Sequence, residues 1–146
     1  MKRPHIPENI KIIVRKQSKF RCGYCQILQR FSPIIFQFDH YIPVSKGGKT
    51  DESNLWLVCG NCNNSKSDKS ECFDPETDSA HPIFNPHTDN WTEHFEWKEN
   101  GAIIFGKTPV GRGTVALLKM NDERIVAVRR EWISAGWHPP KDQSER

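Results

Sequence analysis

Two Cys-x-x-Cys pairs constrain this chain more than any other feature of its sequence. Cys22 and Cys25 form the first pair, Cys59 and Cys62 form the second, and a long segment separates them. Four thiolates in this arrangement are the ligand set of a closed, tetrahedral zinc site. The alternative is a redox-active pair, but that motif needs one pair within a β-α-β pattern, which the sequence does not display. We therefore expect structural zinc.

Charge is distributed unevenly along the 146 residues. Residues 1–30 carry eight lysines and arginines against one acid, whereas residues 67–100 carry nine acids against two lysines. This asymmetry predicts a basic face that binds a polyanion such as nucleic acid, and a merely solvated basic helix is the alternative. No apolar run is long enough to cross a membrane and no signal peptide is recognisable, so we expect a cytoplasmic protein without a membrane partner.

Periodicity and turn residues predict a mixed order of elements in the first half of the chain. The expected elements are a helix over 7–18, a β-hairpin formed by 34–38 and 41–44, a helical turn over 51–57 and a short helix over 62–70. Pro43 confines the second hairpin arm to an edge or a bend.

The second half of the chain has different signals. Residues 73–90 are rich in Pro, Asp and Thr and are predicted to be a linker or wrapping loop. One or two strands should follow, then a helix capped by Thr108 and a last helix capped by Asn121. The tryptophans of this part are expected to pack it onto the preceding core. The alternative for its cations is nucleic-acid contact through Lys107, Arg112, Arg129 and Arg130.

Polar residues between and after the cysteine pairs form a second constellation. It comprises Asp39-His40, Gly47-Gly48, Asn54, Asn63 directly after the last cysteine, and Lys66. A neutral imidazole can deprotonate water near neutral pH, and carboxylate and amide oxygens suit Mg²⁺ or Mn²⁺. Together they can supply the activated water and the charge neutralisation that hydrolysis of a phosphodiester requires. Adjacent residues of a regular strand point to opposite faces, so Asp39 and His40 can share one metal only if the strand ends or bends there.

The order and spacing of these residues, together with the double cysteine motif, resemble the HNH endonuclease family over about residues 8–70. The resemblance implies a ββα-metal fold in which His40 is the general base and Asn54 orients it. It also implies that Asp39 and Asn63 bind the catalytic divalent metal. Asn63 stands where histidine is commoner in the family. Lys66 matches a basic position near the phosphate. The further DNA contacts expected on charge are Lys46, Lys49, Arg15 and Lys11.

These observations predict an α+β protein with an HNH nuclease core over 1–72, a linker over 73–90 and a helical extension over 91–146. The expected activity is metal-dependent hydrolysis of double-stranded DNA, with Zn²⁺ as structural metal and Mg²⁺ or Mn²⁺ as catalytic metal. The alternative is a zinc-stabilised nucleic-acid-binding module without catalysis.

Overall fold

The computed structural model describes residues 4–141, and within that range it combines short helices with three two-stranded antiparallel ribbons. The predicted α+β class is confirmed. The chain divides into two compact units, Met1–Ser70 and Glu71–Arg146. In the part of the chain that the structure describes, every helix is too short or too polar to cross a bilayer.

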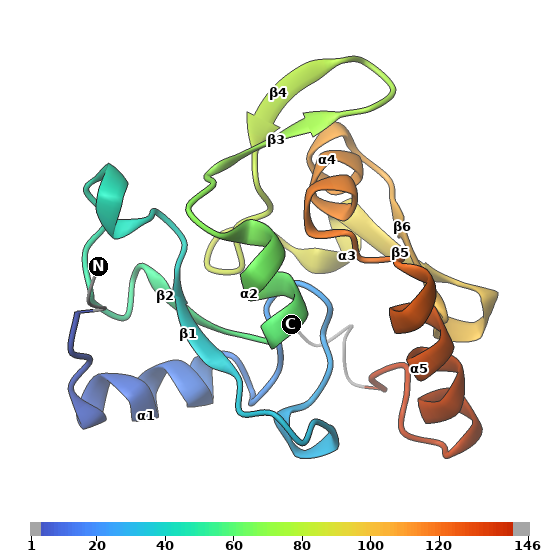
Figure 1. Ribbon diagram of the computed structural model, residues 1–146, viewed down its shortest axis with the longest axis horizontal. Coiled ribbons are helices and arrows are strands. Elements are labelled where there is room, and N and C mark those ends of the chain that lie inside the picture. The colour runs from blue at the N-terminus through green and yellow to red at the C-terminus, as the bar shows by residue number, and fades with distance from the viewer. Residues whose placement is uncertain (1–3, 142–146) are drawn as a thin grey trace. The chain divides into compact units, whose positions relative to one another are not determined.

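The first unit is built around one ribbon, β1 with β2 (Figure 1). Its elements are α1 (Glu8–Gln17), the 3-10 turn η1 (Gln29–Phe31), β1 (Gln37–His40), the 3-10 turn η2 (Val44–Lys46), β2 (Leu55–Val58) and α2 (Gly60–Lys66). In the ribbon, Gln37 lies opposite Val58 and His40 lies opposite Leu55. The order β1-β2-α2 is the ββα arrangement that the family resemblance implies.

Side chains alternate along β1, which gives the ribbon two distinct faces. Phe38 faces α1, because the Arg15 guanidinium carbon lies 5.2 Å from the centroid of its ring. Asp39 faces α2, because Nζ of Lys66 lies 3.2 Å from its carboxylate. All four residues of β2 are buried. Each face of the ribbon is therefore covered by one helix.

The strand that pairs with β1 is not the predicted one. The segment 41–44, expected as the second hairpin arm, is not a strand, and the predicted helical turn over 51–57 ends in β2 instead. Pro43 cannot donate a ladder hydrogen bond, whereas the Leu-Trp-Leu-Val run of β2 is apolar at every position and suits a strand buried on both faces. The predicted helix over 7–18 is confirmed as α1.

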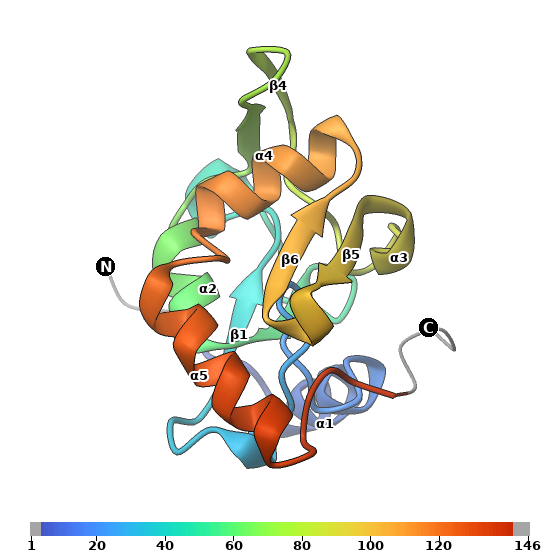
Figure 2. The same ribbon diagram turned by 90° about the vertical axis from the view of Figure 1, so that its right-hand side faces the viewer.

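The second unit contains two ribbons and the helices α3, α4 and α5 (Figure 2). Its elements are β3 (Glu71–Asp74), β4 (Ser79–Pro82), α3 (Trp91–His94), β5 (Phe95–Lys98), η3 (Glu99–Gly101), β6 (Ile103–Gly106), α4 (Pro109–Leu118) and α5 (Glu123–Ser134). Helix α4 packs against both β3 and β6. The β3–β4 hairpin overlaps the first part of the segment 73–90, for which the sequence predicts a linker or wrapping loop.

Helix starts in this unit match the sequence signals only in part. Thr108 caps α4 as predicted, since its hydroxyl accepts a 3.0 Å hydrogen bond from the Gly111 N–H. Asp122 caps α5, because its Oδ1 accepts a 3.0 Å hydrogen bond from the Arg124 N–H. The prediction that Asn121 caps this helix is therefore wrong. Asn121 instead exchanges two hydrogen bonds with the backbone of Ile104, which ties the α4–α5 connection to β6.

The cations of the second unit are largely engaged within it. Arg112 binds Asp74 through two hydrogen bonds of 2.9 Å. Arg129 is 2% exposed and donates to backbone carbonyls. Arg130 pairs with Glu99 at 2.9 Å. Three of the four cations considered as nucleic-acid contacts therefore have internal partners, and Arg112 and Arg129 act in packing.

Burial of His138 predicts a loss of stability of the second unit in mild acid. Its Nε2–H donates to the Gly101 carbonyl at 3.0 Å, and burial lowers the pKa of the ring to about 4. Because this folded-state pKa lies below the unfolded value, the stabilisation is complete above about pH 6.5 and is lost as pH falls towards 4, by up to about 3 kcal/mol. Urea unfolding at a series of pH values measures this loss of stability. His138→Gln should be less stable at pH 7 but lose less stability between pH 7 and 4.5; an unchanged pH dependence would contradict this assignment.

Candidate metal centre and active site

The four cysteines of the two pairs meet in one cluster. Sulfur atoms of Cys22, Cys25, Cys59 and Cys62 all lie within 4.8 Å of one another. The Cys25–Cys59 sulfur distance is 3.7 Å, close to the edge of about 3.8 Å of a tetrahedron with zinc–sulfur bonds of about 2.3 Å. A disulfide needs about 2.0 Å, and these cysteines are free thiols. The predicted four-cysteine site is therefore present, and its geometry fits zinc.

Each pair is shaped by the backbone around it. The Cys22 carbonyl accepts a 3.0 Å hydrogen bond from the N–H of Gln26, which has a positive φ of 69°. This tight turn is joined to β2 because the Gly23 N–H donates to the Leu57 carbonyl at 2.9 Å. In the second pair Cys59 caps α2, and its sulfur accepts from the Cys62 N–H. The cluster therefore links the turn before β1 to the start of α2.

The thiols of this cluster interact too strongly to ionise independently. Hydrogen bonding with Cys22 and the neighbouring thiols, followed by burial, raises the pKa of the Cys62 thiol, whereas hydrogen bonding with Cys22, Cys59 and Cys62 lowers the pKa of the Cys25 thiol. A zinc ion bound here would stabilise all four thiolate forms, which would couple zinc binding to folding of this unit.

Asn54 closes the long loop between β1 and β2. Its side chain is bonded on both ends: Oδ1 accepts from the Ile42 N–H at 2.8 Å, and Nδ2 donates to the carbonyls of Ile42 and Lys49 at 3.0 and 2.9 Å. The residue is 8% exposed. At Gly48 an added Cβ would overlap the Ile42 carbonyl oxygen, so the loop can close this tightly only around glycine. This geometry agrees with the bracing position implied for Asn54.

His40 is held where β1 meets this loop. Its Nε2 lies 2.9 Å from the Thr50 hydroxyl oxygen, and its backbone carbonyl accepts a 2.9 Å hydrogen bond from Lys66. Strand β1 continues through His40, so alternation directs the imidazole away from the face that carries Asp39. The loop that Asn54 closes therefore also supplies the partner of the imidazole.

Asp39 and Lys66 form a buried ion pair between β1 and α2. Asp39 is 8% exposed and Lys66 is fully buried. Burial and then the charge of Asp39 raise the pKa of the nearby Tyr24 phenol. The family resemblance predicts that Lys66 contacts a phosphate, but its ammonium group is directed inward to Asp39 and to the His40 carbonyl. This placement fits a structural role, in which Lys66 holds α2 to β1, better than a phosphate contact.

Asn63 projects from α2 towards the same face of β1. Its Nδ2 donates to Oε1 of Gln37 at 3.0 Å, and Gln37 shares the α2-facing side of β1 with Asp39. Because the amide nitrogen is used in this bond, the orientation leaves Oδ1 as the donor atom available for a cation. Asp39 and Asn63 thus offer carboxylate and amide oxygens, which suit a hard divalent metal.

The remaining predicted DNA contacts lie at several places in the first unit. Lys46 and Lys49 are exposed on the β1–β2 loop, with the Lys46 ammonium 3.5 Å from the Ser70 hydroxyl. Lys11 and Arg15 lie on α1, and Arg15 is also 3.6 Å from Glu8.

Sequence reasoning missed two residues that position this site. Gln37 carries a recognisable signal, because it lies two residues before Asp39 and must share its face of a strand. Thr50 carries none, since only the folded loop brings its hydroxyl to His40.

Comparison with protein families agrees with this geometry. Residues 22–69 match the family model described as HNH endonuclease. The matched segment begins at the first cysteine of the cluster and includes β1, the loop, β2 and α2. A search of the curated proteins finds no match. The resemblance inferred from the residues is confirmed for this segment.

Removal of the zinc ligands should unfold the first unit selectively. We expect Cys59→Ser to lose bound zinc and the folded signals of residues 4–70, because the cluster fastens β2 and α2 to the first turn. Cys72→Ser is the matched control, since Cys72 is a buried thiol of the second unit outside the cluster. Zinc per chain by elemental analysis and amide NMR spectra measure both effects. Retention of one zinc by Cys59→Ser, or its loss from Cys72→Ser, would contradict the assignment.

The Asp39–Lys66 pair gives a second prediction. Lys66→Met should destabilise the first unit by about 3–5 kcal/mol in urea unfolding, because it leaves the Asp39 carboxylate buried without its cation. The double variant Asp39→Leu with Lys66→Met should regain much of this loss. Lys69→Met is the control and should change stability by less than about 0.5 kcal/mol, because Lys69 is exposed. A Lys66→Met variant as stable as the parent would show that the pair is not a buried ion pair in solution.

Proposed function

We propose that this protein is a metal-dependent endonuclease that hydrolyses phosphodiester bonds of double-stranded DNA. The observation that carries the proposal is the family match itself: Asp39 and His40 at the end of β1, and Asn63 on α2, lie in a segment that matches the HNH endonuclease family, and the Asp39 side of β1 faces α2. The asparagine-closed loop and the four-cysteine cluster both support a fixed geometry there.

In this proposal His40 is the general base. When Nε2–H donates to the Thr50 hydroxyl, the lone pair of the neutral imidazole is on Nδ1, which can take a proton from the attacking water. Thr50 then acts as an orienting residue. Asn54 acts one step further away, because it fixes the backbone of the loop that carries Thr50.

Asp39 and Asn63 would hold the catalytic Mg²⁺ or Mn²⁺. Such an ion, when bound, neutralises charge on the scissile phosphate and on the leaving oxygen. Gln37 orients the Asn63 amide for this purpose. Lys66 limits the negative charge at Asp39 and anchors the end of β1. The basic groups of α1 and the loop, Lys11, Arg15, Lys46 and Lys49, supply phosphate contacts that give affinity without sequence choice.

A zinc-stabilised nucleic-acid-binding module without catalysis is the second candidate, and one observation favours it. The ammonium of Lys66 already neutralises Asp39 at 3.2 Å, so a divalent cation must share that carboxylate with a buried lysine. In this candidate the ion pair is purely structural, and DNA binding needs no magnesium.

A plasmid-nicking assay tests both candidates. The parent protein is expected to nick supercoiled DNA when Mg²⁺ or Mn²⁺ is added, and His40→Ala should reduce the rate by about 10²–10⁴-fold, because a general base contributes about that much. Reactions are stopped with a chelator that leaves the sulfur-bound zinc in place. The zinc content and the melting temperature of His40→Ala should equal those of the parent protein.

His81→Ala is the matched control, because His81 lies on β4 in the second unit. Equal nicking by the parent and His40→Ala would exclude His40 as the base. DNA binding by the parent without any metal-dependent nicking would favour the second candidate.

A further inference from the structure

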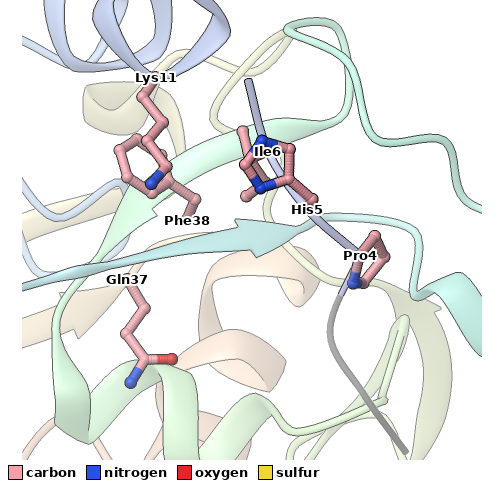
Figure 3. Close-up of a pocket in the computed structure, with 6 residues that line it drawn as sticks. All are labelled: Pro4, His5, Ile6, Lys11, Gln37 and Phe38. Atoms are coloured by element: carbon pink, nitrogen blue, oxygen red, sulfur yellow. The ribbon is translucent and has the colours of Figure 1, made fainter. Parts of the chain in front are cut away.

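A pocket lies beside β1 in the first unit, and it adds four lining residues to Lys11 and Gln37, which already have roles in the proposed function. Its volume is about 290 Å³, at the lower end of the range for ligand pockets. The lining residues are Pro4, His5, Ile6, Lys11, Gln37 and Phe38. Figure 3 shows Lys11 and Phe38 close together on one side of β1, with His5 and Ile6 beside them.

The lining chemistry suits an anion joined to a flat ring. Lys11 supplies a fixed positive charge and His5 an imidazole that can donate a hydrogen bond, and none of the six lining residues is acidic. Phe38 supplies an aromatic surface, and the Arg15 guanidinium already lies over its ring at 5.2 Å. Aromatic rings combined with arginine and lysine are the elements with which proteins bind unpaired nucleotides.

The position of the pocket relates it to the candidate active site. Phe38 and His40 are two residues apart on β1, so their side chains share a face and their Cα atoms are separated by about 6.6 Å. That separation is of the order of one nucleotide along an extended strand. Gln37 also lines the pocket, but its side chain points to the other face of β1, where it accepts the hydrogen bond from Asn63 (Figure 3). The pocket therefore lies on the face of His40, and Gln37 connects it to the face of the candidate metal ligands.

We propose that this pocket binds an unpaired nucleotide beside the candidate active site, on the His40 face of β1. Phe38 provides a platform for its base, and Lys11 with His5 contacts its phosphate. This inference rests on the proposed nuclease function for the choice of DNA as the ligand, and it names a subsite that the catalytic residues do not define. It also assigns the N-terminal segment 4–6 and α1 a specific place in substrate binding.

Binding measurements without cleavage test the subsite independently of the nuclease activity. The probe is a fluorescent single-stranded oligonucleotide, measured by anisotropy with the zinc-loaded His40→Ala protein in the absence of added magnesium. Phe38→Leu should weaken binding by about tenfold, because stacking on one base is worth about that much. Lys11→Ala should also weaken binding by about tenfold, because it removes a contact to the phosphate. Phe38→Tyr keeps the ring and should bind as the parent does.

Two control variants separate a built pocket from a generally basic surface. Lys16→Ala removes an equal charge from an exposed position of α1, and Phe20→Ala removes an exposed ring outside the pocket. Both should change binding by less than about twofold, as expected of surface substitutions. Equal losses in Lys11→Ala and Lys16→Ala would overturn the proposal in favour of diffuse electrostatic attraction.

NMR titration identifies the ligand chemistry. Thymidine 5′-monophosphate should shift the signals of His5, Lys11 and Phe38 at lower concentration than inorganic phosphate does. Equal effects of the two would reduce the pocket to an anion site and overturn the nucleotide assignment. If nicking fails while these signals still respond to the nucleotide, the nuclease function is wrong and the nucleotide site remains.

Discussion

The sulfur cluster is the constraint on which the first unit depends. The ribbon of this unit has only four residue pairs, and α2 has only seven residues, so neither would be stable alone. The cluster fastens the turn at Cys22 and Cys25 to the residues where β2 ends and α2 begins. Because Asn63 follows Cys62 directly, the cluster that holds Cys62 also fixes the position of Asn63, a candidate metal ligand. A structural metal bound by these cysteines would therefore fix the geometry of a site that itself contains no cysteine.

The loop between β1 and β2 is organised by hydrogen bonds rather than by packing. Asn54 binds the backbone at both ends of the segment 42–49, and Gly48 allows the close approach that this requires. Loops of this length without strands are uncommon unless they have a function. Here the closed loop carries Thr50 to the imidazole of His40. Asn54 therefore fixes the loop that holds the partner of the candidate base.

The sequence predicted the parts of the fold that depend on local signals. The zinc ligands, α1, the cap of α4 and the α+β class follow from residue type and spacing, and the structure agrees. The predicted strand pairing was wrong, because β2 is apolar at every position and so has no alternation to distinguish it from a short buried helix. The inward orientation of Lys66 was also hidden, because a lysine near the end of a short polar helix is normally exposed. Only the packing of α2 on β1 places the ammonium group of Lys66 beside Asp39.

Lys66 presents the sharpest physical question about catalysis in this unit. A buried carboxylate requires a counter-charge, and the lysine provides it whether or not a divalent cation is bound. Two cations at one carboxylate repel each other, which weakens metal affinity, yet the lysine also holds the Asp39 carboxylate in place. Its second bond, to the His40 carbonyl, couples the two ends of the candidate site through one side chain. If the site is catalytic, its metal affinity is therefore set by how far Asp39 can turn from Lys66 without releasing the end of β1.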